Sequence, residues 1–150
     1  LGTAWILVGV AVVAQHAWVT GTGEQLRAAN LPWLPIIGAG GLGQVFIGAL
    51  TYLMPVVIGG GPRAVRVGVG ALETAAPMRE AARNAALVLL AAATASQAPA
   101  AAPLATACWA VVLATYLADI ALMARAGTAQ ARARTAPPSP SPSNTGGPRG

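Results

Sequence analysis

The sequence has few charged groups and few of the side chains that carry out chemistry. Of its 150 residues only 9% are charged, none is lysine, and cysteine and histidine each occur once. Soluble domains carry about 25% charged residues, so a soluble fold would lack the polar groups to cover its surface. A lone cysteine excludes an internal disulfide framework and a cysteine-based metal site. The shortage of charge therefore predicts a membrane protein.

The charges that are present do not form a nucleic-acid site or a catalytic group. The net charge is +5, from nine arginines and four acids, and the arginines flank apolar segments instead of forming one basic face. A phosphate-binding surface would gather them on one face, so no nucleic-acid partner is expected. Four acids and one histidine in these positions assemble neither a nucleophile triad nor a carboxylate pair, and no catalytic residue is predicted.

Four apolar segments have the length of transmembrane helices, because about 20 apolar residues span the hydrocarbon core. We therefore predict an all-α polytopic membrane protein with about four transmembrane helices. From residue 126 the chain becomes rich in proline, serine and arginine, which predicts a disordered C-terminal tail over 126–150. Because the sequence opens inside an apolar segment, we expect it to be the C-terminal part of a longer protein. The predicted spans are residues 1–18, 34–58, 77–97 and 104–124.

The arginines lie mainly on one side of these spans. Eight fall on that side and Arg27 alone on the other, so the positive-inside rule places both ends in the cytoplasm. The prevalence of Ala, Gly and Arg indicates a GC-rich bacterial genome, and the expected location is the bacterial cytoplasmic membrane. Residues 63–73 are expected to form a solvated cytoplasmic loop or to lie on the inner membrane surface, where anionic lipid attracts arginine.

The span 34–58 contains the pattern G-x-G-x-x-G between Gly38 and Gly43. In a dinucleotide site such glycines follow a buried strand and open a helix. Pro35 would lie in that strand, where proline is nearly excluded, and no acid follows at the ribose spacing. These residues argue against a dinucleotide-binding enzyme fragment, which remains one alternative.

Placed on a helix, the same region has one face of small and polar residues, which we call the glycine seam. Spacings of three and four residues put its members in one row. Membrane helices associate through small residues that let backbones approach, and polar side chains bond across the contact. The seam therefore predicts contact with other transmembrane helices of the same or a partner chain, with a kink at its proline. Its members are Gly41, Gln44, Gly48, Thr51 and Pro55.

Asp119 and His16 are the remaining candidates for chemistry. Asp119 is the only acid inside a predicted span, and an intramembrane carboxylate suggests a proton relay or an ion pair with arginine. It lies close to the cytoplasmic end, where Arg125 is within reach along the helix. His16, near the outer end of the first span, is a weak metal or haem candidate. The alternative for this histidine is a role at the membrane interface or in helix packing, because no second histidine is present to complete a metal site.

Residues 43–66, GQVFIGALTYLMPVVIGGGPRAVR, resemble the last part of the membrane module of bacterial copper oxidases and multicopper oxidases. The resemblance implies a parent protein linked to copper or respiratory redox chemistry. Copper or haem would then be bound by other parts of that parent, and this chain is expected to hold no cofactor. The matching positions are Gln44, Gly48, Tyr52, Pro55 and the loop 59–62, with weak similarity over 5–124.

Three functions follow as alternatives. The first is a membrane-embedded fragment of a copper-oxidase-like protein, whose role is to pack against lipid and other helices. The second is a small transporter or proton-conducting subunit that uses Asp119, with Gln44 and Thr51 as further polar groups inside the membrane. The third is the dinucleotide-binding fragment.

Overall fold

The computed structural model describes residues 1–73 and 75–135, and within them the protein is entirely helical. Two short elements differ from α-helix: η1 is a π-helix that continues directly into α4, and η2 is a single 3-10 turn before α7. The elements are α1 (Gly2–Val19), α2 (Gly23–Asn30), α3 (Leu34–Ile37), η1 (Gly38–Gly43), α4 (Gln44–Ile58), α5 (Gly61–Glu73), α6 (Ala76–Ser96), η2 (Pro99–Ala101) and α7 (Ala102–Thr135).

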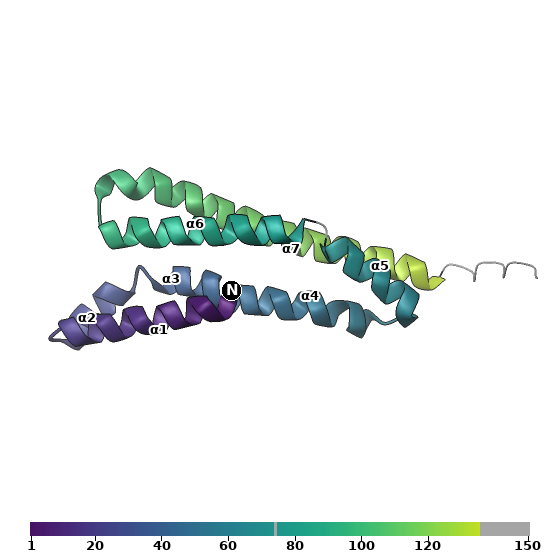
Figure 1. Ribbon diagram of the computed structural model, residues 1–150, viewed down its shortest axis with the longest axis horizontal. Coiled ribbons are helices and arrows are strands. Elements are labelled where there is room, and N and C mark those ends of the chain that lie inside the picture. Colours follow the sequence, from purple (N-terminus) through teal and green to yellow (C-terminus); the bar gives the residue numbers. More distant parts are fainter. Residues whose placement is uncertain (74, 136–150) are drawn as a thin grey trace, which may run out of the picture.

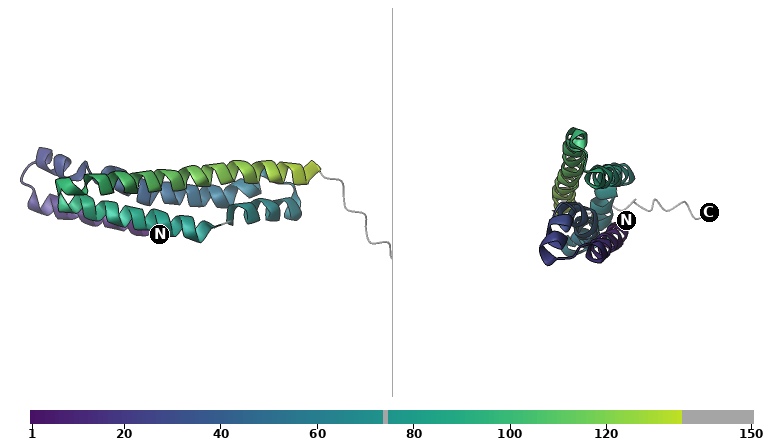
Figure 2. Two further views of the ribbon diagram at one scale, coloured as in Figure 1. Left: turned by 90° about the horizontal axis from the view of Figure 1, so that it is seen from above. Right: turned by 90° about the vertical axis from the view of Figure 1, so that its left-hand side faces the viewer.

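The helices form an elongated bundle in which α7 runs most of the length (Figure 1). At 1.5 Å per residue its 34 residues extend about 51 Å. Helices α5 and α6 lie end to end along α7, and both pack against it. On the other side of the bundle α1 packs against η1, and α4 packs against α5 and α7 (Figure 2). Each half of the bundle has its own apolar core, one around Leu87 and Val112 and one around Leu72 and Met123.

Among the described residues, three helical segments are long and apolar enough to cross a membrane: Gly2–Val19, Leu34–Ile58 and Pro99–Thr135. They correspond to the first, second and fourth predicted spans, and large apolar side chains along them point outward. The third predicted span, 77–97, is a helix of the expected length, α6. It is not among the three, because three charged side chains occupy its first turns: Arg79, Glu80 and Arg83.

The predicted start of the disordered tail at residue 126 is wrong, because α7 continues to Thr135. Residues 126–135 include alanines, glutamine and arginines, which favour helix. This part of α7 also has tertiary partners, since Ala126 and Gln130 are buried at 2% and 1% exposure. Residues 136–150 of the predicted tail lie outside the described residues.

The segment predicted as a loop, 63–73, is also corrected: it belongs to helix α5. Ala64, Gly68 and Leu72, spaced four residues apart, form one buried face of that helix. α5 packs closely along α7 through this face. A Cβ added at Gly68 would lie 2.6 Å from Oε1 of Gln130, so a larger residue there would force the Gln130 side chain to shift.

The end of α4 is held by α7. The last carbonyls of a helix have no partner within it and need outside donors. Nε2 of Gln130 donates to the carbonyls of Pro55 and Gly59, both at 2.7 Å, and Nη1 of Arg134 donates to the carbonyl of Ile58 at 2.9 Å. The proline within α4 and the glycines after it are therefore fixed by side chains from the far end of the chain.

Replacing Gln130 by Leu should loosen this end. The carbonyls of Pro55, which is buried, and Gly59, which is partly buried, would lose this donor, which costs about 1–3 kcal/mol in the free energy of unfolding. The measurement is unfolding in detergent micelles. Thr128→Leu, an exposed position on the same helix, is the control and should change the free energy by no more than about 0.5 kcal/mol. Equal stabilities of the two variants would contradict the capping role.

Candidate functional site

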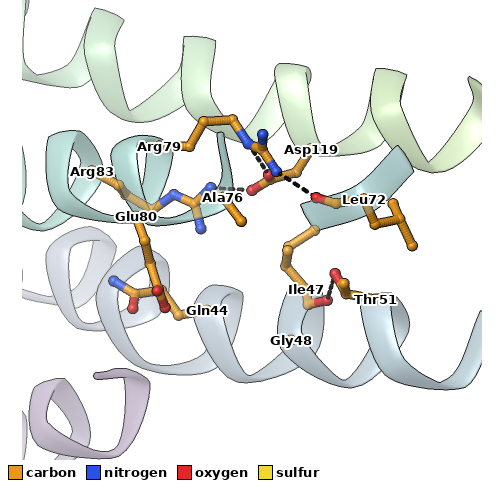
Figure 3. Close-up of a pocket in the computed structure, with 10 residues that line it drawn as sticks. All are labelled: Gln44, Ile47, Gly48, Thr51, Leu72, Ala76, Arg79, Glu80, Arg83 and Asp119. Carbon is orange, nitrogen blue, oxygen red and sulfur yellow. Dashed lines mark hydrogen bonds and ion pairs between the residues drawn. The ribbon is translucent and has the colours of Figure 1, made fainter. Parts of the chain in front are cut away.

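The main polar site is an ion triad formed by Arg79, Arg83 and Asp119. Arg79 and Arg83 lie four residues apart on α6 and so share one face, which meets α7 at Asp119. Nε of Arg79 donates to Oδ1 of Asp119 at 2.8 Å, and Nη2 of Arg83 donates to Oδ2 (Figure 3). Each carboxylate oxygen thus has its own guanidinium partner.

Both arginines have further partners that fix their positions. Nε of Arg83 donates to the hydroxyl of Thr115 at 3.1 Å, and its guanidinium lies 4.1 Å from the ring centroid of Tyr116, a cation–π contact. Arg83 is 3% exposed. Nη2 of Arg79 donates to the carbonyl of Leu72 at 3.2 Å, in the last turn of α5. The triad therefore connects α5, α6 and α7.

A cavity of about 200 Å³ opens beside the triad, between α4 and α6. On the α4 side it is lined by Gln44, Gly48 and Thr51 (Figure 3). The Thr51 hydroxyl donates to the carbonyl of Ile47 in its own helix, at 2.8 Å. Glu80, exposed to solvent, lines the same cavity. The cavity thus carries two positive and two negative charges, and within the described part of the chain both arginines are paired with Asp119.

Gln44 belongs to a second polar cluster that joins three helices. Its Nε2 donates to Oδ1 of Asn84 at 3.0 Å, and the same oxygen accepts from the indole N–H of Trp5 at 2.8 Å. Nδ2 of Asn84 donates to the carbonyl of Glu80 at 2.7 Å, which fixes the orientation of the amide. This cluster bonds α1, α4 and α6 together. Oε1 of Gln44 is buried and has no partner among the described residues.

The predicted partner of Asp119, Arg125, is corrected by this geometry. Asp119 is bound by two arginines of α6, whereas Arg125 is exposed on α7. Arg125 lies six residues after Asp119, a rotation of about 240° on a helix, so it projects from another side of α7.

The glycine seam makes contact along part of its length. Gly41 is buried against α1, where an added Cβ would lie 2.8 Å from Cγ1 of Ile6. Pro55 is buried at the other end. Gly48, between them, has nothing within 4 Å of an added Cβ among the described residues. Its predicted packing contact is therefore not made within this chain and stays a prediction.

His16 lies at the opposite end of the bundle from α5. Nδ2 of Asn30 donates to the carbonyl of Leu26 at 2.9 Å, which turns Oδ1 of Asn30 toward Nδ1 of His16, 2.9 Å away. Nδ1 of His16 is therefore the donor of that pair. Among the described residues no group of three or more His, Cys, Asp or Glu side chains is placed to hold a metal ion.

The polar partners that sequence reasoning missed are Asn84, Tyr116 and Gln130. One signal was available: Arg79, Arg83 and Asn84 give α6 a polar face in its first half, which an intramembrane acid on the next helix would complement. Nothing in the sequence singles out Gln130, since its partners are backbone carbonyls.

The fold and this site define a class: over the residues that the structure describes, the protein is all-helical, with three helices suited to a membrane and polar clusters between its helices. Comparisons with protein families, curated proteins and solved structures found no match to this chain.

Proposed function

We propose that this chain is a multi-pass segment of the bacterial cytoplasmic membrane whose role is structural: it holds a helical bundle together through the ion triad. The observation that carries the proposal is that both carboxylate oxygens of Asp119 are bound, one by Arg79 and the other by Arg83, within a bundle of apolar helices. A buried charge is costly unless it is paired, so the triad ties α6 to α7 in one register.

The antiparallel packing of α6 beside α7 supports four spans. α6 lies along the first half of α7, the half that begins the apolar segment Pro99–Thr135. If α7 crosses the membrane, α6 crosses beside it, with Arg79 and Arg83 near the cytoplasmic boundary and neutralised in part by Asp119. Four spans place both ends in the cytoplasm, as the arginine distribution favours.

The proposal extends to a copper-oxidase-like parent protein, on the resemblance of residues 43–66. The matching positions contribute to structure in this chain: Gln44 bonds α6 through Asn84, and the carbonyl of Pro55 accepts from Gln130. Tyr52 is 77% exposed and faces outward. Copper or haem of such a parent would be held elsewhere, and lipid together with other transmembrane helices would cover the outward faces of this chain.

The transporter alternative assigns proton transfer to Asp119. Its two oxygens are already bound to guanidinium groups, which favours a fixed ion pair over a proton carrier. In the complete parent protein, loss of coupled transport on Asp119→Asn with unchanged bundle stability would establish the alternative and overturn the structural role.

A membrane extraction and labelling experiment tests the proposal. We expect the chain to resist carbonate extraction. In a Cys108→Ala background, a cysteine at Arg27 should react with an impermeant maleimide in spheroplasts, because this exposed position is predicted to face outward. Cysteines at Arg66 and Thr128, also exposed, should react only after lysis.

Extraction of the chain by carbonate would overturn the membrane proposal. Labelling of position 128 from outside, with 66 protected, would mean that α6 does not cross the membrane.

A further inference from the structure

We infer that a groove between α5 and α7 binds the phosphate headgroup of an anionic phospholipid, with an acyl chain lying along α7. This inference rests on the proposed membrane location. The groove has a volume of about 480 Å³. It is lined by Ala71, Leu122, Arg125, Thr128, Ala129 and Arg132.

Two arginines supply the positive charge of the groove. Arg125 and Arg132 are seven residues apart, two turns of α7, and lie on one face about 10 Å apart along the axis. Both are exposed, and in the described part of the chain both ion pairs belong to Asp119, so neither arginine pairs with an acid there. The Thr128 hydroxyl, between them, donates to the carbonyl of Arg125 at 2.8 Å. The guanidinium groups are therefore the donors offered to an anion.

The acid closest in sequence to the groove faces elsewhere. Glu73, at the end of α5, lines a separate hollow between α4 and α5. The charge that the groove presents is thus positive, and guanidinium groups bind phosphate oxygens strongly.

The surface beyond the groove is suited to a lipid chain. Counting back from Arg125 in steps of three and four residues gives the row Ala121, Ala118, Ala114 and Val111 along the same face of α7. Val111 is 41% exposed, and Leu117 beside this row is 65% exposed. A row of small apolar residues leaves a shallow apolar furrow that an acyl chain can fill. A free anion or a nucleic acid would not bind in such a furrow.

The position along α7 agrees with the headgroup level. About 20 helical residues cross the hydrocarbon core, so a span beginning at Ala102 ends at roughly residue 121. Arg125 follows about one turn later, at the level of the lipid phosphates, and Arg132 lies two turns further along the same face of α7. Basic pockets between helices on the cytoplasmic side are suited to anionic headgroups.

The test measures lipid binding by the purified full-length chain in a neutral detergent. Native mass spectrometry would compare added phosphatidylglycerol with phosphatidylcholine. We expect a preference for phosphatidylglycerol that falls about 30-fold in the double variant R125Q/R132Q, roughly fivefold for each arginine. Arg66→Gln is the matched control: it removes one exposed arginine of α5 that does not line the groove, and should leave the preference within about twofold.

Three outcomes would overturn the inference: no preference in the unaltered chain, a loss in Arg66→Gln comparable to that of either groove arginine replaced alone, or displacement of the lipid by millimolar inorganic phosphate. The first would mean that the chain does not select an anionic headgroup, the second would indicate diffuse attraction to charge, and the third a free-anion site. Circular dichroism must show that the double variant keeps its helix content; if it does not, the single variants R125Q and R132Q decide. Carbonate resistance of the chain is measured separately, so the lipid site can fail while the membrane proposal stands.

Discussion

Replacing Asp119 by Asn should destabilise the bundle by about 3–5 kcal/mol. Arg79 and Arg83 would be left facing each other without a carboxylate, and Arg83 is 3% exposed. Removing one partner of a buried ion pair has this cost because the remaining charge stays buried and uncompensated. The measurement is the free energy of unfolding in detergent micelles, titrated with a denaturing detergent and followed by circular dichroism.

Glu80→Gln is the matched control, because Glu80 lines the same cavity but is exposed. Its stability should change by no more than about 0.5 kcal/mol. A triple apolar variant, with Arg79 and Arg83 replaced by Met and Asp119 by Leu, should regain most of the stability, since apolar side chains of similar volume can replace a buried ion pair. If Asp119→Asn and Glu80→Gln unfold alike, the triad does not hold the bundle.

Replacing Gly40 by Val should separate α1 from η1 and cost about 1–3 kcal/mol. An added Cβ at Gly40 would lie 2.6 Å from Cγ of Trp5, which is closer than side-chain atoms approach. Trp5 is 8% exposed and its indole N–H is bound to Asn84, so the ring cannot move without breaking that bond. Overpacking a tight contact has a cost of this size. Trp5 fluorescence during unfolding, in a background lacking the other tryptophans, would report it.

Gly48→Val is the control for this prediction, because an added Cβ there meets nothing within 4 Å. Glycine is a poor helix former, so this variant should be as stable as the unaltered chain or slightly more stable. If Gly48→Val destabilises the purified chain, the space beside Gly48 is too small for a valine side chain and the prediction is wrong. If Gly48→Val instead weakens only the association of this chain with other transmembrane helices of a parent protein, the glycine seam packs against those helices.

The helices with strong apolar character could be predicted from the sequence. The predicted span 34–58 is the continuous helical segment Leu34–Ile58, and 1–18 corresponds to α1. Length and hydropathy are enough here, because a chain in hydrocarbon has to satisfy its backbone hydrogen bonds internally. The helix α5 was missed because it contains several glycines, which disfavour helix, and its stability comes from packing on α7.

The partners of the polar residues could not be predicted in the same way. Asp119 was recognised as an unusual acid, but its partners Arg79 and Arg83 lie 40 and 36 residues earlier. Pairing over that distance depends on the rotation and axial position of two helices, which a pattern within one helix does not determine. Gln44 was likewise singled out, whereas its partner Asn84 became visible only in the folded chain.

The order of the triad along the chain has a consequence for biogenesis. Arg79 and Arg83 are synthesised before Asp119, and if α6 inserted alone, Arg83 would have to enter the bilayer without its carboxylate partner. Helix α6 alone is therefore poorly suited to leave the translocon sideways into lipid. If α6 crosses the membrane as proposed, insertion becomes favourable when α7 brings the Asp119 carboxylate beside the two arginines, and the two helices should enter the bilayer together as a hairpin.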